Sequence, residues 1–165
     1  MSDSHLFFYG RRGGPVHAEH VAANASRRTD LAFLSNFAAA PFMLRGVRWP
    51  TSEHFYQAQK FADTDPDWAE AIRLAPSASK AAAMGRNRSH PMRKDWDTAR
   101  DAVMLEALRQ KFDQNPSLRT KLKDTGSATL HEDAGTRDCY WGAGTPKCPG
   151  RDRLGQLLEQ VRKDL

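Results

Sequence analysis

Residues 49–62 read WPTSEHFYQAQKFA, and this stretch decides how the middle of the chain folds. Pro50 cannot donate to a strand's hydrogen-bonding ladder, so it ends the extended pattern that precedes it. Thr51 and Ser52 are good N-cap residues, because a side-chain hydroxyl can accept from the unpaired N–H groups of a helix's first turn. The stretch therefore predicts a helix from about Ser52 to Ala62.

One face of this predicted helix is polar. With about 100° between successive residues, Glu53, Gln57 and Lys60 fall on the same side. This face is either solvated, as on most amphipathic helices, or lines a pocket. In a pocket, the carboxylate could move protons and the amine could attack an electrophilic carbon. Apolar residues gather on the opposite side: Phe55, Ala58 and Ala62.

The surrounding segments predict a mostly α fold with a few short strands, in a single compact domain over residues 1–165. A strand is expected at His5–Tyr9, before a loop-rich insertion over residues 10–30. The clearest helix is expected at Thr98–Phe112, where apolar residues recur at helical spacing. Other extended segments are expected at Phe33–Phe37 and, around a turn at Gly46, at Phe42–Trp49. Other helices are expected at Pro66–Leu74, at Ala78–Met84, from Pro116 to Gly126, and at Arg153–Lys163.

Composition limits the classes of function. At 165 residues the chain is long enough for one domain with a core and too short for two ordinary domains. Its apolar runs are far shorter than a membrane-spanning helix, and the N-terminus lacks the pattern of a secretory signal, so we expect no membrane association and a cytoplasmic location. The net charge of +5 favours an anionic partner such as a phosphorylated metabolite, a dinucleotide or DNA.

Neither a metal site nor a disulfide is predicted. Cys139 and Cys148 lack the paired spacing of a zinc site and the density of a disulfide scaffold, so two ordinary thiols are expected. His17 and His20 could share a helix face, but two ligands make a weak metal site. No phosphate-loop or dinucleotide fingerprint is present. We therefore expect no metal and no cofactor.

Two further clusters carry candidate chemistry. The run DCYWGAGT places Asp138, Tyr140 and Trp141 before glycines that let the backbone approach a ligand closely. The alternative is a core tryptophan beside a glycine turn, and both interpretations stay open. The run over residues 84–96 carries cations that either contact phosphate or form a solvated basic turn: Arg86, Arg88, Arg93 and Lys94.

Taken together and in this order, the segments FLSNF, WPTSEHFYQAQKF, MGR, KDW, ALRQKF, DCYWGAG and LGQLL resemble the NADAR, or YbiA-like, family of N-glycosidases. The resemblance runs from about Leu31 to the C-terminus. The family is known for cleaving the bond between ribose C1 and an exocyclic amine, in phosphorylated ribosylamino-pyrimidine intermediates of riboflavin synthesis or in ADP-ribose attached to guanine in DNA. The resemblance implies a hydrolase that acts on N-glycosyl bonds.

The resemblance also implies roles for individual residues. Glu53 of SEH matches the family's catalytic glutamate, a general acid and base. Lys60 of QAQKF matches its lysine and is expected to add to ribose C1 as a Schiff base. Asp138 is expected to position the leaving amine. The expected substrate-binding residues are Asn36, Trp49, Gln57, Arg86, Tyr140, Trp141 and Gly142.

The main expectation is removal of ADP-ribose from guanine bases in DNA, because the chain is basic and its N-terminal insertion is longer than in compact family members. Hydrolysis of phosphorylated riboflavin intermediates is the alternative within the same chemistry. A non-catalytic reader of ADP-ribose or nucleotides is a third possibility, although retention of Glu53 and Lys60 argues against it. A basic nucleic-acid-binding protein is the fourth, but no recognition helix is evident. Asp152 stands where an asparagine is expected, which changes affinity or specificity if this position faces phosphate.

Overall fold

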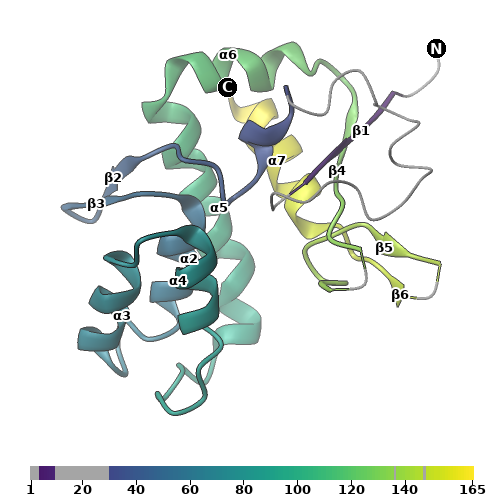
Figure 1. Ribbon diagram of the computed structural model, residues 1–165. Helices are drawn as coiled ribbons and strands as arrows, with labels where there is room; N and C mark the ends of the chain where they lie inside the picture. Colours follow the sequence, from purple (N-terminus) through teal and green to yellow (C-terminus); the bar gives the residue numbers. More distant parts are fainter. Residues whose placement is uncertain (1–3, 10–29, 136, 147) are drawn as a thin grey trace. The chain divides into compact units, whose positions relative to one another are not determined.

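The computed structural model describes residues 4–9, 30–135, 137–146 and 148–165. The chain groups into two compact units: a central unit, Ala39–Asn115, and a terminal unit that combines Met1–Ala38 with Pro116–Leu165. Figure 1 shows the elements that make up each unit. The insertion predicted over residues 10–30 lies outside the described residues except for Asp30.

The central unit opens with a hairpin. Strand β2 (Phe42–Leu44) pairs antiparallel with β3 (Val47–Trp49). Both residues of the turn have positive φ, 54° at Arg45 and 80° at Gly46. This turn conformation matches the twist of the two strands, and glycine adopts it without a steric penalty. The predicted extended segments and the turn around Gly46 are confirmed.

Helices make up the rest of the central unit. Most of them begin at a capping side chain: Thr51 accepts from the backbone N of His54, Asp65 from that of Trp68, and Ser77 from that of Lys80. The first helix packs against each of the others, and all of its residues are buried. The helices are α2 (Ser52–Gln59), α3 (Pro66–Arg73), α4 (Ala78–Met84) and α5 (Trp96–Gln114).

The terminal unit is built on a parallel strand pair. β1 (His5–Phe8) pairs with β4 (Thr129–Glu132), and helix α7 (Arg153–Asp164) packs on β4 (Figure 1). A Cβ atom at Gly155 would lie 1.9 Å from the Leu130 carbonyl oxygen, so only glycine permits this close approach of helix and strand. The remaining described elements are the 3-10 helix η2 (Ala32–Leu34), α6 (Pro116–Asp124), β5 (Gly144–Thr145) and β6 (Cys148–Pro149).

The prediction of a mostly helical fold with a few short strands is confirmed, but one extended segment is corrected. Residues 33–37 form no strand, because η2 is followed by a turn in which the Ser35 hydroxyl accepts from the backbone N of Phe37 at 3.0 Å. Such local side-chain bonds compete with strand formation, which the aromatic composition of FLSNF does not reveal. No helix among the described residues has both the length and the apolar character needed to cross a membrane.

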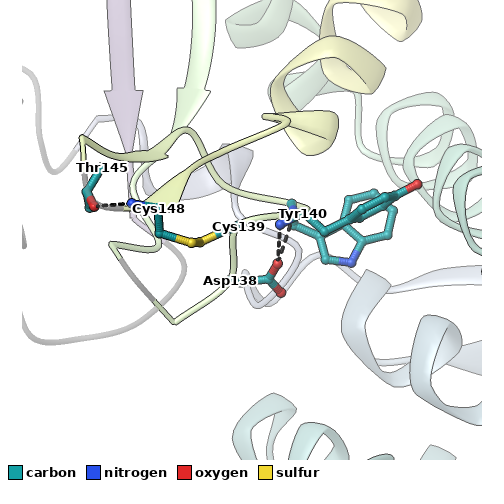
Figure 2. Close-up of a disulfide and its surroundings, with 6 residues drawn as sticks. Asp138, Cys139, Tyr140, Thr145 and Cys148 are labelled. Atoms are coloured by element: carbon teal, nitrogen blue, oxygen red, sulfur yellow. Dashed lines mark hydrogen bonds between the residues drawn. A yellow bond between two sulfur atoms is a disulfide. The ribbon is translucent and has the colours of Figure 1, made fainter.

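The prediction of two ordinary thiols is wrong. Cys139 and Cys148 form a disulfide, with their Cα atoms 6.3 Å apart (Figure 2). The short antiparallel pair of β5 and β6 turns the chain back on itself between the two cysteines. Gly144, in β5, has a φ of 72°, a left-handed conformation that glycine adopts without a steric penalty. Sequence spacing could not show this proximity, because it depends on the path of the intervening loop.

Candidate active site

Helix α2 buries its polar face. Glu53 is 4% exposed and Gln57 is 6% exposed, so the solvated interpretation of this face does not hold for them. Gln57 Nε2 donates to Glu53 Oε1 at 2.6 Å, as the four-residue spacing on a helix allows. A carboxyl group removed from water and held by a fixed donor has a defined orientation. It can therefore transfer a proton in a defined direction.

Lys60 follows as the C-cap residue of α2 and is half-buried. Its Nζ lies 3.4 Å from the carbonyl oxygen of Gly85, 5.4 Å from the centroid of the Tyr56 ring and 5.6 Å from that of Trp96. A carbonyl dipole and aromatic ring faces both stabilise a positive charge. These contacts position the ammonium form, and a nucleophilic role requires that Lys60 first lose a proton.

His54, next to Glu53, has a structural role. Its Nε2 lies 3.1 Å from the carbonyl oxygen of Ala75, and its Nδ1 lies 2.8 Å from the Thr51 hydroxyl. Because a carbonyl only accepts, Nε2 carries the proton and Nδ1 accepts from Thr51. Burial lowers the pKa of His54, in agreement with a neutral ring. Nε2 thus ties the start of α2 to the loop after α3, and Nδ1 holds the ring against the N-cap residue Thr51.

The basic run after α4 is anchored to the end of α2. The backbone N of Arg93 donates to the carbonyl oxygen of Lys60 at 2.8 Å. The guanidinium of Arg93 pairs with Asp95 at 2.6 Å, and this hydrogen bond raises the pKa of Arg93. Arg93 is therefore engaged within the protein, whereas three other cations of the run are exposed: Arg86, Arg88 and Lys94.

Trp49 belongs to the core of the central unit. Its side chain is 5% exposed, and its Nε1 donates to the carbonyl oxygen of Leu44 at 3.1 Å. The ring packs edge-on against Phe55, with the centroids 5.0 Å apart. These contacts explain how Trp49 closes the hairpin, and its role in substrate binding stays a prediction.

In the terminal unit, Asp138 shapes the loop that carries the predicted aromatic residues. Its Oδ1 accepts from the backbone N of Tyr140 at 3.0 Å and from that of Trp141 at 2.9 Å (Figure 2). The two aromatic rings meet nearly at right angles, with centroids 5.1 Å apart. The Arg151 guanidinium lies 5.5 Å from the Tyr140 ring centroid. One carboxylate oxygen of Asp138 thus sets the path of the chain through both aromatic residues.

Gly142 is explained by the chain's own packing. A Cβ atom there would lie 2.7 Å from Ala134 Cβ and 2.9 Å from the carbonyl oxygen of Asp138. The backbone N of Gly142 donates to that same carbonyl at 3.2 Å. The close approach that requires glycine is therefore made by the protein itself, and a substrate contact of Gly142 stays a prediction. Asn36, also predicted to bind substrate, is buried at 7% exposure.

Comparison with known proteins decides the family. The model of the NADAR domain matches residues 23–165. The chain belongs to the NADAR family. The predicted recognition and the prediction of an enzyme that hydrolyses N-glycosyl bonds are confirmed at this level.

Two relatives and one solved structure illustrate the match to NADAR proteins. The chain is 46% identical over 140 residues to the N-glycosidase YbiA of Shigella flexneri serotype 5b, covering 85% of each chain. It is 38% identical over 133 residues to a riboflavin biosynthesis protein of Vibrio vulnificus, covering 81% of this chain but 35% of that protein. The NMR structure of the E. coli protein YbiA matches with a TM-score of 0.76 and 39% identity, covering 99% of this chain and 86% of that chain.

The structure sorts the predicted site residues of this NADAR protein by unit, and it adds others. Sequence reasoning missed Tyr56 and Trp96, whose rings lie 4.9 Å apart beside Lys60, because aromatic residues are common in any core. It also missed Gly85, the middle residue of MGR. The central unit holds Glu53, Gln57, Lys60, Arg86 and the core residue Trp49, and the terminal unit holds Asn36, Asp138, Tyr140, Trp141 and Gly142.

The Asp152 carboxylate is hydrogen-bonded within the terminal unit of the NADAR domain. Its Oδ2 lies 2.5 Å from His131 Nδ1, and its Oδ1 accepts from the backbone N of Glu132 at 3.2 Å. The carboxylate thus ties the start of α7 to β4. No group of three or more His, Cys, Asp or Glu in the described part of the chain could hold a metal ion, and His17 and His20 lie outside that part.

Proposed function

We propose that this NADAR protein removes ADP-ribose from guanine bases in DNA by hydrolysing the bond between ribose C1 and the exocyclic amine. The observation that carries the proposal is the buried Glu53, held by Gln57, on the helix whose C-cap residue is Lys60. Hydrolysis of a ribose-linked amine needs a group that moves protons, and it is helped by an amine that forms a covalent intermediate.

The proposed reaction has four steps. Glu53 protonates the ribose ring oxygen as its bond to C1 breaks, and the C1–N bond becomes an imine. The neutral amine of Lys60 adds to C1. The proton that the added Lys60 nitrogen gives up passes to the guanine amine, which departs and leaves C1 in an imine with Lys60. Water, deprotonated by Glu53, hydrolyses this imine and releases ADP-ribose and unmodified lysine.

Other residues are proposed to bind the substrate. Asp138 uses Oδ1 to hold its loop, and we assign its other oxygen to the departing amine. The Tyr140 and Trp141 rings offer flat surfaces for stacking on a base. Asn36 is assigned to the ribose, and the exposed Arg86 to a phosphate.

Charge favours the DNA-linked substrate. ADP-ribose on DNA presents a pyrophosphate and the phosphates of the strand, and the chain carries a net charge of +5. The exposed cations Arg86, Arg88 and Lys94 suit such a polyanion. The second candidate is a phosphorylated riboflavin intermediate, which the name of the Vibrio vulnificus relative favours. Both substrates contain a ribose-linked exocyclic amine, so the same chemistry serves either.

The test offers both substrates to the same enzyme preparation and follows the products by mass spectrometry. The DNA substrate is a single-stranded oligonucleotide with one ADP-ribosylated guanine, because a base inside a duplex would first have to leave the stack. We expect release of ADP-ribose and of an intact, unmodified oligonucleotide. Release of ribose phosphate from the riboflavin intermediate alone would select the second candidate, and release from neither would contradict both.

Glu53→Gln is the matched control for this assay. The substitution keeps the size and the hydrogen-bonding capacity of the side chain but removes its titratable proton. We expect turnover to fall at least about a hundredfold, the typical contribution of a positioned acid–base group. The variant should retain the circular dichroism spectrum of the wild type. Full turnover in Glu53→Gln would remove Glu53 from the mechanism.

A further inference from the structure

Gly85 ends helix α4 in a conformation that does not call for glycine. Its φ and ψ are −65° and −13°, in the right-handed helical region that every L-residue adopts. Glycine at the end of a helix usually supplies a left-handed residue. That reason is absent at Gly85, so the need for glycine must come from its surroundings.

The space beside Gly85 is filled by one side chain. A Cβ atom on Gly85 would lie 1.9 Å from Oε1, 2.6 Å from Cδ and 3.0 Å from Cβ of Gln57. All of these distances are shorter than ordinary van der Waals contacts, and the closest two involve the amide end of Gln57. A larger residue at position 85 would therefore displace the Gln57 amide.

The Gln57 amide has one hydrogen bond that fixes it. Its Nε2 donates to Glu53 Oε1 at 2.6 Å, whereas its buried Oε1 accepts no hydrogen bond within the described residues. Because Oε1 makes no hydrogen bond, this oxygen does not hold the amide in place, and its burial costs free energy. Two features set the position of the Gln57 amide: its hydrogen bond to Glu53, and the space left by the missing side chain at Gly85.

Gly85 also contacts the second reacting group, because its carbonyl oxygen accepts from Lys60 Nζ at 3.4 Å. We propose that Gly85 is a positioning residue, whose missing side chain lets Gln57 hold Glu53 and whose carbonyl orients Lys60. Gln57 accordingly acts on Glu53. The inference rests on the proposed function only in assigning the reaction to Glu53 and Lys60.

The first test is Gly85→Ala. Alanine is favoured over glycine in the helical conformation, so the backbone of α4 should be retained, although displacing the buried Gln57 amide should lower the melting temperature. The displaced amide no longer holds the carboxyl group of Glu53. Loss of the hydrogen bond between Gln57 and Glu53 should lower kcat about ten- to hundredfold, with KM nearly unchanged. Ala83→Ser, which adds one atom at an exposed position of the same helix, is the matched control and should leave kcat unchanged.

A double-mutant cycle separates this mechanism from a general disturbance of α4. Gln57→Ala removes both the amide and the clash, so adding Gly85→Ala to it should lower kcat less than about twofold further. Additive losses from the two substitutions would overturn the proposal. If Gly85→Ala does not fold, Gln57→Met decides, because it keeps the side chain's bulk without the donor. It should reproduce the loss in kcat, and wild-type kcat in that variant would contradict the proposal.

A substrate-free measurement distinguishes failure of this inference from failure of the proposed function. In the wild type, the Nε2 protons of Gln57 should give a shifted, slowly exchanging pair of NMR signals, because one proton is bonded to a buried carboxyl group. Gly85→Ala should return this pair to the ordinary position of glutamine amides, whatever the substrate is. An unchanged pair in Gly85→Ala would overturn the inference, even if the enzyme hydrolyses ADP-ribosylated guanine.

Discussion

Two of the lysines in the central unit, Lys60 and Lys111, have surroundings that differ in kind. Lys60 is half-buried, and its ammonium group meets a carbonyl oxygen and two aromatic rings. Lys111 lies fully buried on α5, where burial lowers its pKa to about 7. Under the proposed function Lys60 reacts with the substrate, whereas Lys111, inside the core, affects mainly the stability of the fold.

At the residue scale, the proposed Schiff base at Lys60 can be trapped. Borohydride added during single turnover should reduce the imine and leave a ribose-linked mass on the peptide that contains Lys60. Peptide mass spectrometry measures both the site and the yield.

Lys60→Arg is the control for trapping, because it keeps the positive charge near the rings of Tyr56 and Trp96 but offers no amine that forms an imine. It should give no adduct and little turnover. An active wild-type enzyme that never yields an adduct at Lys60 would restrict this lysine to an electrostatic role.

Lys111 makes the stability of the protein depend on pH. Its pKa is about 7 in the folded protein, against 10.5 ordinarily. Between these values the unfolded chain binds a proton that the folded protein does not, so the free energy of unfolding should rise with pH. The slope is at most about 1.4 kcal/mol per pH unit. Below pH 7 Lys111 is charged in the folded protein as well, and the full cost of burying its charge lowers the free energy of unfolding.

Urea unfolding at pH 7, 8 and 9 measures this effect. Lys111→Met keeps the length of the side chain without its charge, so its free energy of unfolding should rise less with pH than that of the wild type. Other titrating groups are shared by both proteins and cancel in the difference. Equal slopes would show that burial of Lys111 does not set the pH dependence.

At the scale of the element, α2 shows what a sequence pattern can and cannot predict. Its start at Ser52 follows from Thr51, because capping is a local interaction. Its end at Gln59, before the predicted Ala62, and its burial on all sides were not predictable from periodicity. Neighbouring helices cover even the polar face at Glu53 and Gln57, and periodicity within one helix contains no information about those neighbours.

The disulfide between Cys139 and Cys148 should stabilise the loop that carries Asp138, Tyr140 and Trp141. Closing a loop of this size restricts the unfolded chain and contributes about 2–3 kcal/mol. The double variant Cys139→Ser, Cys148→Ser should lower the free energy of unfolding by that amount in urea denaturation. A reducing agent should weaken the wild type equally and leave the double variant unchanged. Identical stability of the oxidised and reduced wild type would contradict this prediction.

At the scale of the whole molecule, helix positions and the family were predictable, because both depend on local runs of residues such as WPTSEHFYQAQKF. What sequence could not supply were contacts between distant segments. Helices α3 and α4 lie between Gln57 and Gly85 in the sequence, so their contact could not be predicted. The same holds for Cys139 and Cys148, because the path of the loop between them does not follow from the sequence. The internal contacts of Trp49 and Gly142 were not predictable for the same reason, since a motif residue that packs inside the protein looks the same in sequence as one that meets a ligand.

The division of the chain into a continuous central unit and a discontinuous terminal unit has a consequence for the order of folding. All residues of the central unit have left the ribosome once Asn115 has emerged, so Glu53, Gln57, Lys60 and Gly85 can assemble early. Strand β1, although made before the central unit, must wait for β4, because His5 pairs with Thr129. The nascent chain thus carries an unpaired, aromatic strand until β4 has emerged, and pairing across so long a loop is intrinsically slow. During synthesis, this strand is where chaperone binding or aggregation is expected to begin.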